Sequence, residues 1–368
     1  MSSPHDRPHD QPEPGPNPGP REGLSDVSAV RAEGLVRTFD GLTAVDGVDL
    51  DIPRGEIYGF LGPNGAGKST TVRMLCTLLA PSGGRATVAG YDVATRPGEV
   101  RLRIGAALQE VALDPKQTGA ELLRLQGVLY GLPKSAMAAR VTELGELIDL
   151  TDALDRPIAT YSGGMRRRLD LAAALVHNPD ILFLDEPTTG LDPMSRASVW
   201  AEVRRLNREL GMTIFLTTQY LEEADELAHR VGIIDKGRIV AEGTPAELKR
   251  TVGTDVIVVR IDGDGAGVCP IVEKVPGVQS VEVRGPELVI ATESGPATVS
   301  PVAVALAGCE VGVRELTLRT PTLDDVFLDL TGTRIERDDD RGDGFDAGHD
   351  DTHDDSRDDS RDHEGAPT

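Results

Sequence analysis

The chain has 368 residues, 39% of them hydrophobic, which is enough for two domains with separate hydrophobic cores. Its formal net charge of −23 disfavours nucleic acid as a partner, because affinity for nucleic acid depends on a basic surface. A membrane-spanning helix needs about 20 apolar residues. The uncharged, largely apolar segment 295–309 has 15 residues and two prolines, so no membrane span is predicted.

The two ends of the chain differ in composition from its middle. The first 20 residues contain seven prolines and no apolar run, so residues 1–27 are predicted to form a disordered leader. Residues 336–368 contain 12 Asp and 2 Glu against 4 Arg, a net charge of −10. Residues 334–368 are therefore predicted to form a disordered acidic tail, and the folded part lies between the two ends.

Two strands are predicted at residues 27–39 and 44–52, where apolar and polar residues roughly alternate. The first strand ends at Phe39, before an Asp-Gly turn. Phe39 has two interpretations: an aromatic side chain upstream of a phosphate-binding loop can stack on a nucleotide base, and a lone aromatic beside a turn can equally pack in a core.

A phosphate-binding loop is the clearest feature of the sequence. The apolar run 57–61 leads into Gly-Pro-Asn-Gly-Ala-Gly-Lys-Ser and then into a helix, the strand–loop–helix order of a P-loop. Backbone N–H groups of such a loop and the helix N-terminus bind phosphate, Lys68 reaches the β- and γ-phosphates, and Ser69 ligates Mg²⁺. The predicted nucleotide contacts are Gly62, Pro63, Asn64, Gly65, Ala66, Gly67, Lys68, Ser69 and Thr70.

A mostly helical segment follows at about residues 110–175, after a short strand at 104–108. Thr118 and Glu121 form a predicted capping box that opens a helix, and a second helix is predicted over 135–148. Ser162-Gly163-Gly164 then precedes a helix at 166–176, with Ser162 as N-cap. This helix start is either a second anion site or an ordinary capped turn, and Arg166–Arg168 are predicted to form a solvated face.

Two carboxylates end the buried strand predicted at 181–186. In a parallel sheet ligands bind at the strand ends, so Asp185 is expected to hold Mg²⁺ through water and Glu186 to polarise an attacking water. Acidic pairs at strand ends also serve as plain helix caps, but the four apolar residues before this pair favour a site. A helix over 199–210 and a buried strand over 213–217 follow, and the domain is predicted to end near residue 250.

Residues 255–318 show a different pattern, with strands predicted at 256–261, 278–284, 288–291 and 311–318. Apolar segments at 271–275 and 302–306 are predicted helices, which gives a βαββαβ order typical of a small ferredoxin-like α+β domain. A closing helix capped by Thr322 follows. The predicted fold class is therefore α/β, with a mixed-sheet nucleotide-binding domain at 28–250 and an accessory domain at 251–333.

Taken in order, residues 29–250 resemble the ATP-binding cassette of ABC transporters. Gly62–Thr70 match Walker A, Ser162-Gly163-Gly164 the signature, and Leu182–Glu186 Walker B. Gln109 matches the Q-loop and Leu191-Asp192 the D-loop. The segments 217–225 and 320–327 resemble the ATP-binding subunits of daunorubicin/doxorubicin-resistance exporters. Two positions depart from the general pattern: Met165 replaces the usual signature Gln, and Gln219 replaces the switch His, which puts the switch chemistry in doubt.

The resemblance implies ATP and Mg²⁺ as ligands and an ATPase activity coupled to drug export. It implies catalytic roles for Glu186, Gln219 and Gln109, Mg²⁺ contacts from Ser69, Gln109 and Asp185, and nucleotide contacts from Ser162, Gly163, Gly164 and Asp192. It also implies two cassettes, identical or paralogous, placed head to tail. They are expected to bind separately encoded permease subunits at the cytoplasmic face of the membrane, and nucleic acid is not an expected partner. The alternative is a cassette ATPase of DNA repair or translation, but the 94 positions from Lys68 to Ser162 hold neither a coiled coil nor a zinc motif.

Overall fold

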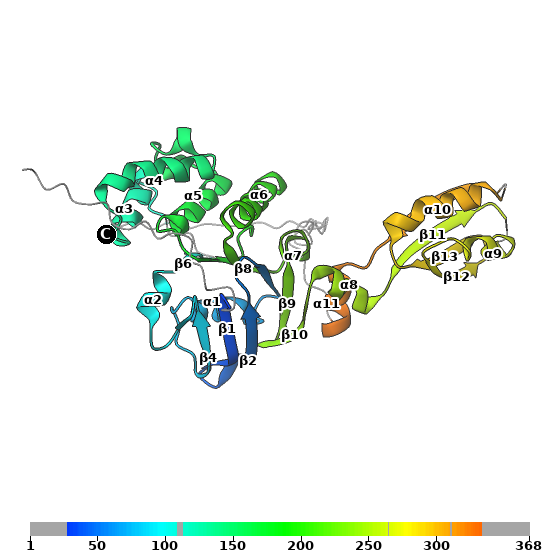
Figure 1. The fold of residues 1–368 in the computed structure, drawn as a ribbon, viewed down its shortest axis with the longest axis horizontal. Coiled ribbons are helices and arrows are strands. Elements are labelled where there is room, and N and C mark those ends of the chain that lie inside the picture. The colour runs from blue at the N-terminus through cyan, green and yellow to red at the C-terminus, as the bar shows by residue number, and fades with distance from the viewer. Residues whose placement is uncertain (1–27, 109–112, 264, 310, 333–368) are drawn as a thin grey trace, which may run out of the picture. The chain divides into compact units, whose positions relative to one another are not determined.

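A computed structural model describes residues 28–108, 113–263, 265–309 and 311–332 (Figure 1). The predicted leader and tail, and the predicted site residue Gln109, lie outside these described residues.

A six-stranded sheet carries the phosphate-binding loop, in the order β10-β9-β3-β8-β7-β6. Its strands are β3 (Ile57–Leu61), β6 (Ile104–Ala107), β7 (Ile181–Asp185), β8 (Thr213–Thr218), β9 (Arg230–Asp235) and β10 (Arg238–Gly243). All neighbours pair in parallel except β10 with β9. The strands β3, β7 and β8 are buried along their whole length, as expected of strands covered on both faces.

A second, antiparallel sheet has the order β2-β1-β4-β5. Its strands are β1 (Val30–Phe39), β2 (Leu42–Ile52), β4 (Gly83–Val88) and β5 (Tyr91–Asp92). One hydrophobic cluster joins this sheet to the first, because Val30 and Ile52 share it with Phe60 and Phe215 and with Val72 of α1 (Lys68–Leu75). The short helix α2 (Pro97–Arg101) connects β5 to β6.

The predicted helical segment is confirmed. It contains α3 (Gly119–Leu129), α4 (Lys134–Leu147) and α5 (Gly163–Leu175), together with two single 3₁₀ turns at Thr151–Ala153 and Ile158–Thr160. The capping box of Thr118 and Glu121 is formed by both of its hydrogen bonds. Helix α5 begins at Gly163, three residues before the predicted start, because Ser162 caps it directly.

Helix α6 (Pro193–Leu210) also begins earlier than the predicted residue 199. The side chain of Asp192 accepts a hydrogen bond from the Ser195 N–H, and Pro193 occupies the first helical position, where its missing N–H has no cost. The D-loop aspartate is thus a helix cap. After α6 the chain continues through β8, α7 (Leu221–Leu227), β9, β10 and α8 (Pro245–Val252).

Residues 255–319 form a four-stranded antiparallel sheet in the order β12-β13-β11-β14. The elements are β11 (Asp255–Ile261), α9 (Cys269–Val272), β12 (Val278–Arg284), β13 (Glu287–Thr292), α10 (Gly295–Ala307) and β14 (Val313–Arg319). The predicted βαββαβ order is therefore confirmed, and the strand order is compatible with the predicted ferredoxin-like arrangement. A separate hydrophobic cluster fills this unit.

The closing helix α11 (Leu323–Thr331) packs away from that cluster (Figure 1). Its buried residues Leu323, Val326 and Phe327 join a cluster with Leu61 of β3 and Leu248 of α8. Its N-cap is Thr322, in a complete capping box with Asp325. Along the chain, the accessory sheet therefore lies between α8 and α11, two helices that pack together.

Within the described ranges, no helix is both long and apolar enough to cross a membrane.

Candidate functional site

The phosphate-binding loop runs from the end of β3 to the first residue of α1. Gly67 has φ of 108°, a left-handed conformation that favours glycine, and a Cβ there would lie 2.5 Å from the carbonyl oxygen of Ala44. A Cβ on Gly62 would lie 2.3 Å from the carbonyl oxygen of Ile234. The two glycines therefore allow close backbone packing, which gives the loop its shape.

Lys68 points back over the loop. Its ammonium donates to the carbonyl oxygens of Gly62 (2.8 Å) and Pro63 (3.1 Å) and lies 3.2 Å from Oε1 of Glu186. The residue is only 4% exposed. Burial lowers the pKa of Lys68, and the carboxylates of Glu186 and Asp185 oppose that shift. A cation held this way is directed at the loop, where an incoming phosphate would compete with Glu186 for it.

Asp185 and Ser69 meet beside the loop. The Ser69 hydroxyl donates to Oδ1 of Asp185 over 3.1 Å, and the Thr217 hydroxyl donates to the same oxygen over 2.5 Å. Ser69 is the second residue of α1, Asp185 is the last residue of β7, and Thr217 lies near the end of β8. Three neighbouring elements therefore contribute one oxygen each. Hard cations such as Mg²⁺ bind oxygen ligands of this kind.

Glu186 has a left-handed backbone, with φ of 49°. Its N–H donates to the Thr217 side chain (3.0 Å) and carbonyl (3.2 Å). Its other carboxylate oxygen, Oε2, accepts from the Thr189 hydroxyl (3.3 Å). The side chain is buried. A non-glycine residue at positive φ is uncommon and persists only where its surroundings hold it.

The signature residues begin α5. Ser162 accepts from the Met165 N–H over 3.2 Å, and Gly163 and Gly164 form the first turn. A Cβ on Gly164 would lie 2.9 Å from the Ser195 hydroxyl, whereas one on Gly163 would meet nothing closer than 3.7 Å. Two hydrogen bonds from Ser195 lower the pKa of Asp192. A cavity of about 340 Å³ is lined by Gly163, Arg166, Arg167, Glu186, Pro187, Thr189, Gly190 and Leu191.

Two predicted site residues lie at the margin of this arrangement. Phe39 is 39% exposed and absent from the hydrophobic clusters, and the Arg37 guanidinium lies 4.4 Å from the centroid of its ring. Gln219 is half-buried and directly follows β8, whose parallel neighbours β3 and β7 lead to the P-loop and to Asp185. Base stacking by Phe39 and the switch role of Gln219 stay predictions.

The environment predicted for Arg167 from the sequence was wrong. The prediction of a solvated face holds for the exposed Arg166, but it is wrong for Arg167, which is 7% exposed and donates to the carbonyl oxygens of Leu108, Asp185 and Pro187. Helical spacing could have identified it, because Arg167 precedes the buried Leu171 by four residues and so shares its face. Thr217 was also missed, although it lies near the end of a buried strand.

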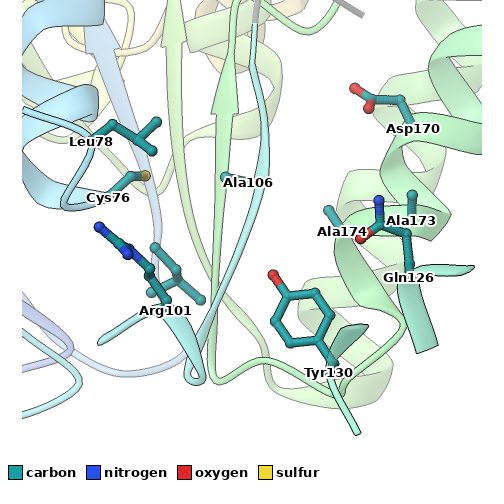
Figure 2. Close-up of a pocket in the computed structure, with 10 residues that line it drawn as sticks. Cys76, Leu78, Arg101, Ala106, Gln126, Tyr130, Asp170, Ala173 and Ala174 are labelled. Atoms are coloured by element: carbon teal, nitrogen blue, oxygen red, sulfur yellow. The ribbon is translucent and has the colours of Figure 1, made fainter. Parts of the chain in front are cut away.

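A second cavity, of about 260 Å³, lies away from the P-loop (Figure 2). Figure 2 shows Leu78, Cys76 and Arg101 on one side and Asp170, Ala173 and Gln126 on the other, with Tyr130 below. Burial raises the pKa of Asp170 to about 6, and the nearby Arg167 opposes that shift. This cavity contains none of the predicted nucleotide contacts.

The glycine loop after a buried parallel strand, with a carboxylate at the end of a neighbouring strand, defines a P-loop nucleoside triphosphatase. Residues 45–189 match the family described as ABC transporter, and residues 243–331 match the C-terminal domain of DrrA1-3-like ATP-binding proteins. The chain is 50% identical over 319 residues to the daunorubicin resistance ATP-binding protein DrrA2 of Streptomyces coeruleorubidus, covering 84% of this chain and 97% of that protein.

Other relatives agree. The daunorubicin/doxorubicin resistance ATP-binding protein DrrA of Streptomyces peucetius is 47% identical over 83% of this chain and 92% of its own. Among solved structures, cbiO1 from Clostridium perfringens, part of the ABC transporter complex cbiONQ, is similar with a TM-score of 0.57 and 28% identity, over 62% of this chain and 94% of that one. The chain therefore belongs to the ATP-binding subunits of the ABC transporter family, and it is an ATPase.

Proposed function

We propose that this chain powers the export of drugs or other amphipathic compounds through a separately encoded membrane permease. The observation that carries the proposal is the match to resistance ATP-binding proteins over 92–97% of their own length, accessory domain included. A further relative, the linearmycin resistance ATP-binding protein LnrL of Bacillus subtilis, is 37% identical over 98% of its length. A role in DNA repair or translation has no comparable support.

The exported compound is set outside this chain. A Nod factor export ATP-binding protein of Cupriavidus metallidurans is 41% identical over 78% of this chain, so closely similar cassettes carry names for different cargos. A cassette that supplies energy while the permease selects the compound accounts for this diversity. We place the chain at the cytoplasmic face of the membrane, bound to its permease.

In the nucleotide site, ATP would lie over residues 62–70, with its phosphates on the loop N–H groups and the N-terminus of α1. Ser69 and Asp185 fit Mg²⁺, because their oxygens already lie 3.1 Å apart at the end of the loop. Held there, Mg²⁺ would supply positive charge against the negative charge that develops on the phosphate during transfer. Gln109 is proposed as a further ligand on the resemblance alone.

Phosphate binding would release Glu186 for catalysis. The Lys68 ammonium contacts two loop carbonyls and Glu186. A phosphate takes the place of Glu186 at the Lys68 ammonium, which frees that carboxylate to accept a hydrogen bond from the attacking water. Gln219 is proposed to orient the same water, because an amide both donates and accepts hydrogen bonds.

Two chains are proposed to share each ATP, with the P-loop of one facing the signature and Asp192 of the other. The chain has one copy of each motif, so a head-to-tail pair, identical or paralogous, would complete two sites. The accessory domain, proposed as residues 251–333 after a cassette at 28–250, contains no second Gly-Lys-Ser motif in its sequence. It is proposed to modulate the pair rather than to bind nucleotide.

The substitution Gly163→Asp tests the shared site. Position 163 has space for a side chain, whereas a Cβ at Gly164 would collide with Ser195. A carboxylate there would repel the γ-phosphate held by the other chain, so hydrolysis should be lost while ATP binding persists. Gly163→Ala is the control for helix geometry.

A mixing experiment sharpens the test. A chain with Gly163→Asp keeps its P-loop, and a chain with Lys68→Ala keeps its signature, so a mixed pair contains one intact shared site. Hydrolysis that reappears on mixing two inactive chains supports the proposal. Equal loss of ATP binding and hydrolysis in Gly163→Asp alone would count against it.

A further inference from the structure

The buried guanidinium of Arg167 contacts both sides of Glu186. Its Nε donates to the carbonyl oxygen of Pro187 over 2.9 Å, and one Nη donates to the carbonyl oxygen of Asp185 over 3.1 Å. Its other Nη donates to the carbonyl oxygen of Leu108 (3.0 Å) and lies 3.3 Å from the Asp170 carboxylate. One side chain of α5 therefore binds the residues that directly precede and follow Glu186.

The backbone at Glu186 needs such support. Its φ of 49° is left-handed, a conformation that a residue with a side chain rarely adopts. Thr217 holds the N–H of Glu186 from β8, and Arg167 holds the two flanking carbonyls from α5. The peptide group between Asp185 and Glu186 is thereby held at both its N–H and its carbonyl, and the chain is held again at the Pro187 carbonyl, which restricts the direction in which the Glu186 side chain leaves the backbone.

An arginine is suited to this position for a geometric reason. A guanidinium presents five N–H donors in a rigid plane, so it can serve carbonyls in three directions at once, whereas the lysine ammonium is a compact charge on a flexible stem. The cation is compensated in the interior by Asp170, on the next turn of the same helix.

We propose that Arg167 is a positioning residue for ATP hydrolysis, which holds Glu186 in its left-handed conformation and ties it to the helix that begins at Ser162. The inference rests on the proposed catalytic role of Glu186. Arg167 makes no contact in the described structure with Lys68 or with the loop 62–67, so it belongs to the hydrolytic step and not to nucleotide binding.

The test compares Arg167→Lys with Arg168→Lys in the full-length chain. Arg168 is the next residue of α5 and also donates to a backbone carbonyl, that of Ile148 (3.0 Å), but it has no contact with residues 185–187 in the described structure. A displacement of about 1 Å at a catalytic group can cost 10²-fold, so kcat of Arg167→Lys should fall about 10- to 100-fold. The ATP dissociation constant should stay within about twofold of wild type, and Arg168→Lys should keep kcat.

A purely structural role predicts a different result, in which Arg167→Lys lowers the melting temperature but retains wild-type kcat well below that temperature. That result would overturn the inference, and so would parallel losses of ATP binding and kcat. If the lysine variant fails to fold, the second variant combines Arg167→Gln with Asp170→Asn, which removes both charges of the buried pair and so leaves neither unpaired. It should show the same separation of kcat from ATP binding.

A double-mutant cycle shows whether Arg167 acts through Glu186. In the Glu186→Gln background, measured in single turnovers, Arg167→Lys should reduce the rate by less than about twofold, because residues acting as one unit are not additive. If Arg167→Lys lowers the rate by the same factor in the wild-type and Glu186→Gln backgrounds, the assignment of Arg167 as a positioning residue for Glu186 is refuted. If Glu186→Gln alone hydrolyses ATP like wild type, the proposed role of Glu186 fails instead, which distinguishes the two failures.

Discussion

The ion pair between Lys68 and Glu186 should hold ATP affinity down, and Glu186→Gln should therefore bind ATP more tightly than wild type. Oε1 of Glu186 lies 3.2 Å from the Lys68 ammonium, which a bound phosphate would also contact, and both side chains are about 5% exposed. A hydrogen bond to a charged group contributes about 1.5–3 kcal/mol, and because the Lys68 ammonium stays charged, replacing the carboxylate by an amide moves this bond from the upper to the lower end of that range. The amide would thus stabilise the ligand-free state by about 1.4 kcal/mol less, which corresponds to about tenfold in Kd.

Titration calorimetry with ATP in EDTA measures this affinity without hydrolysis. Accumulation of an ATP-bound pair would also tighten apparent binding, so Kd is measured at two protein concentrations, and only the shift common to both reports the Lys68 contact. The control is Glu222→Gln, which removes one exposed negative charge on α7. With Mg²⁺ present, turnover of Glu186→Gln should fall by roughly 10²–10⁴-fold. An unchanged Kd beside lost turnover would show that the ion pair does not compete with phosphate.

Three further predictions concern the switch position, the second cavity and the closing helix. Gln219→Ala should lower turnover while Gln219→His retains it, and a titration step between about pH 6 and 7 should appear in the pH–rate profile of the histidine variant only; wild-type activity in Gln219→Ala would make Gln219 a bystander. The pKa of Asp170 is raised from 3.8 to about 6, so the folded state holds the carboxyl proton more tightly than the unfolded state does. The contribution of Asp170 to the free energy of unfolding therefore falls as pH rises, by about 3 kcal/mol in all. Asp170→Asn removes this dependence, so its stability relative to wild type should rise by about 1 kcal/mol between pH 5 and 7 in urea unfolding, and a constant difference would contradict the assignment. Phe327→Ala should lower the free energy of unfolding by about 3–5 kcal/mol, while Leu330→Ala on the exposed side of α11 should cost far less; similar losses would show that the packing of α11 is not specific.

Local chemistry made most of the fold predictable. The capping box at Thr118 and the helix cap at Thr322 use hydrogen bonds that close within four residues, so they could be predicted from sequence spacing and were confirmed. The early starts of α5 and α6 were missed because the apolar pattern begins a turn later than the caps at Ser162 and Asp192. A search that gave the cap more weight than the periodicity would have placed both.

Contacts between distant segments were beyond the sequence. Nothing near Lys68 indicates that its ammonium would lie against Glu186, because the pair depends on the order of β3, β8 and β7 in the sheet. Three consecutive arginines look alike in sequence, and only the packing of α5 against the ends of β6 and β7 buries Arg167. The apolar spacing of α11 predicted a buried face, but not that this face meets β3 and α8.

The packing of α11 has a consequence for the order in which the chain folds during synthesis. Leu61, beside the phosphate-binding loop, shares a hydrophobic cluster with Phe327, which the ribosome adds more than 260 residues later. Until then the nascent cassette exposes an apolar surface on β3, β9 and α8, and the whole accessory sheet must leave the ribosome before that surface can be covered. A chain stopped before α11 would present this surface to chaperones, so a complete nucleotide-binding half would be available only from a fully translated protein.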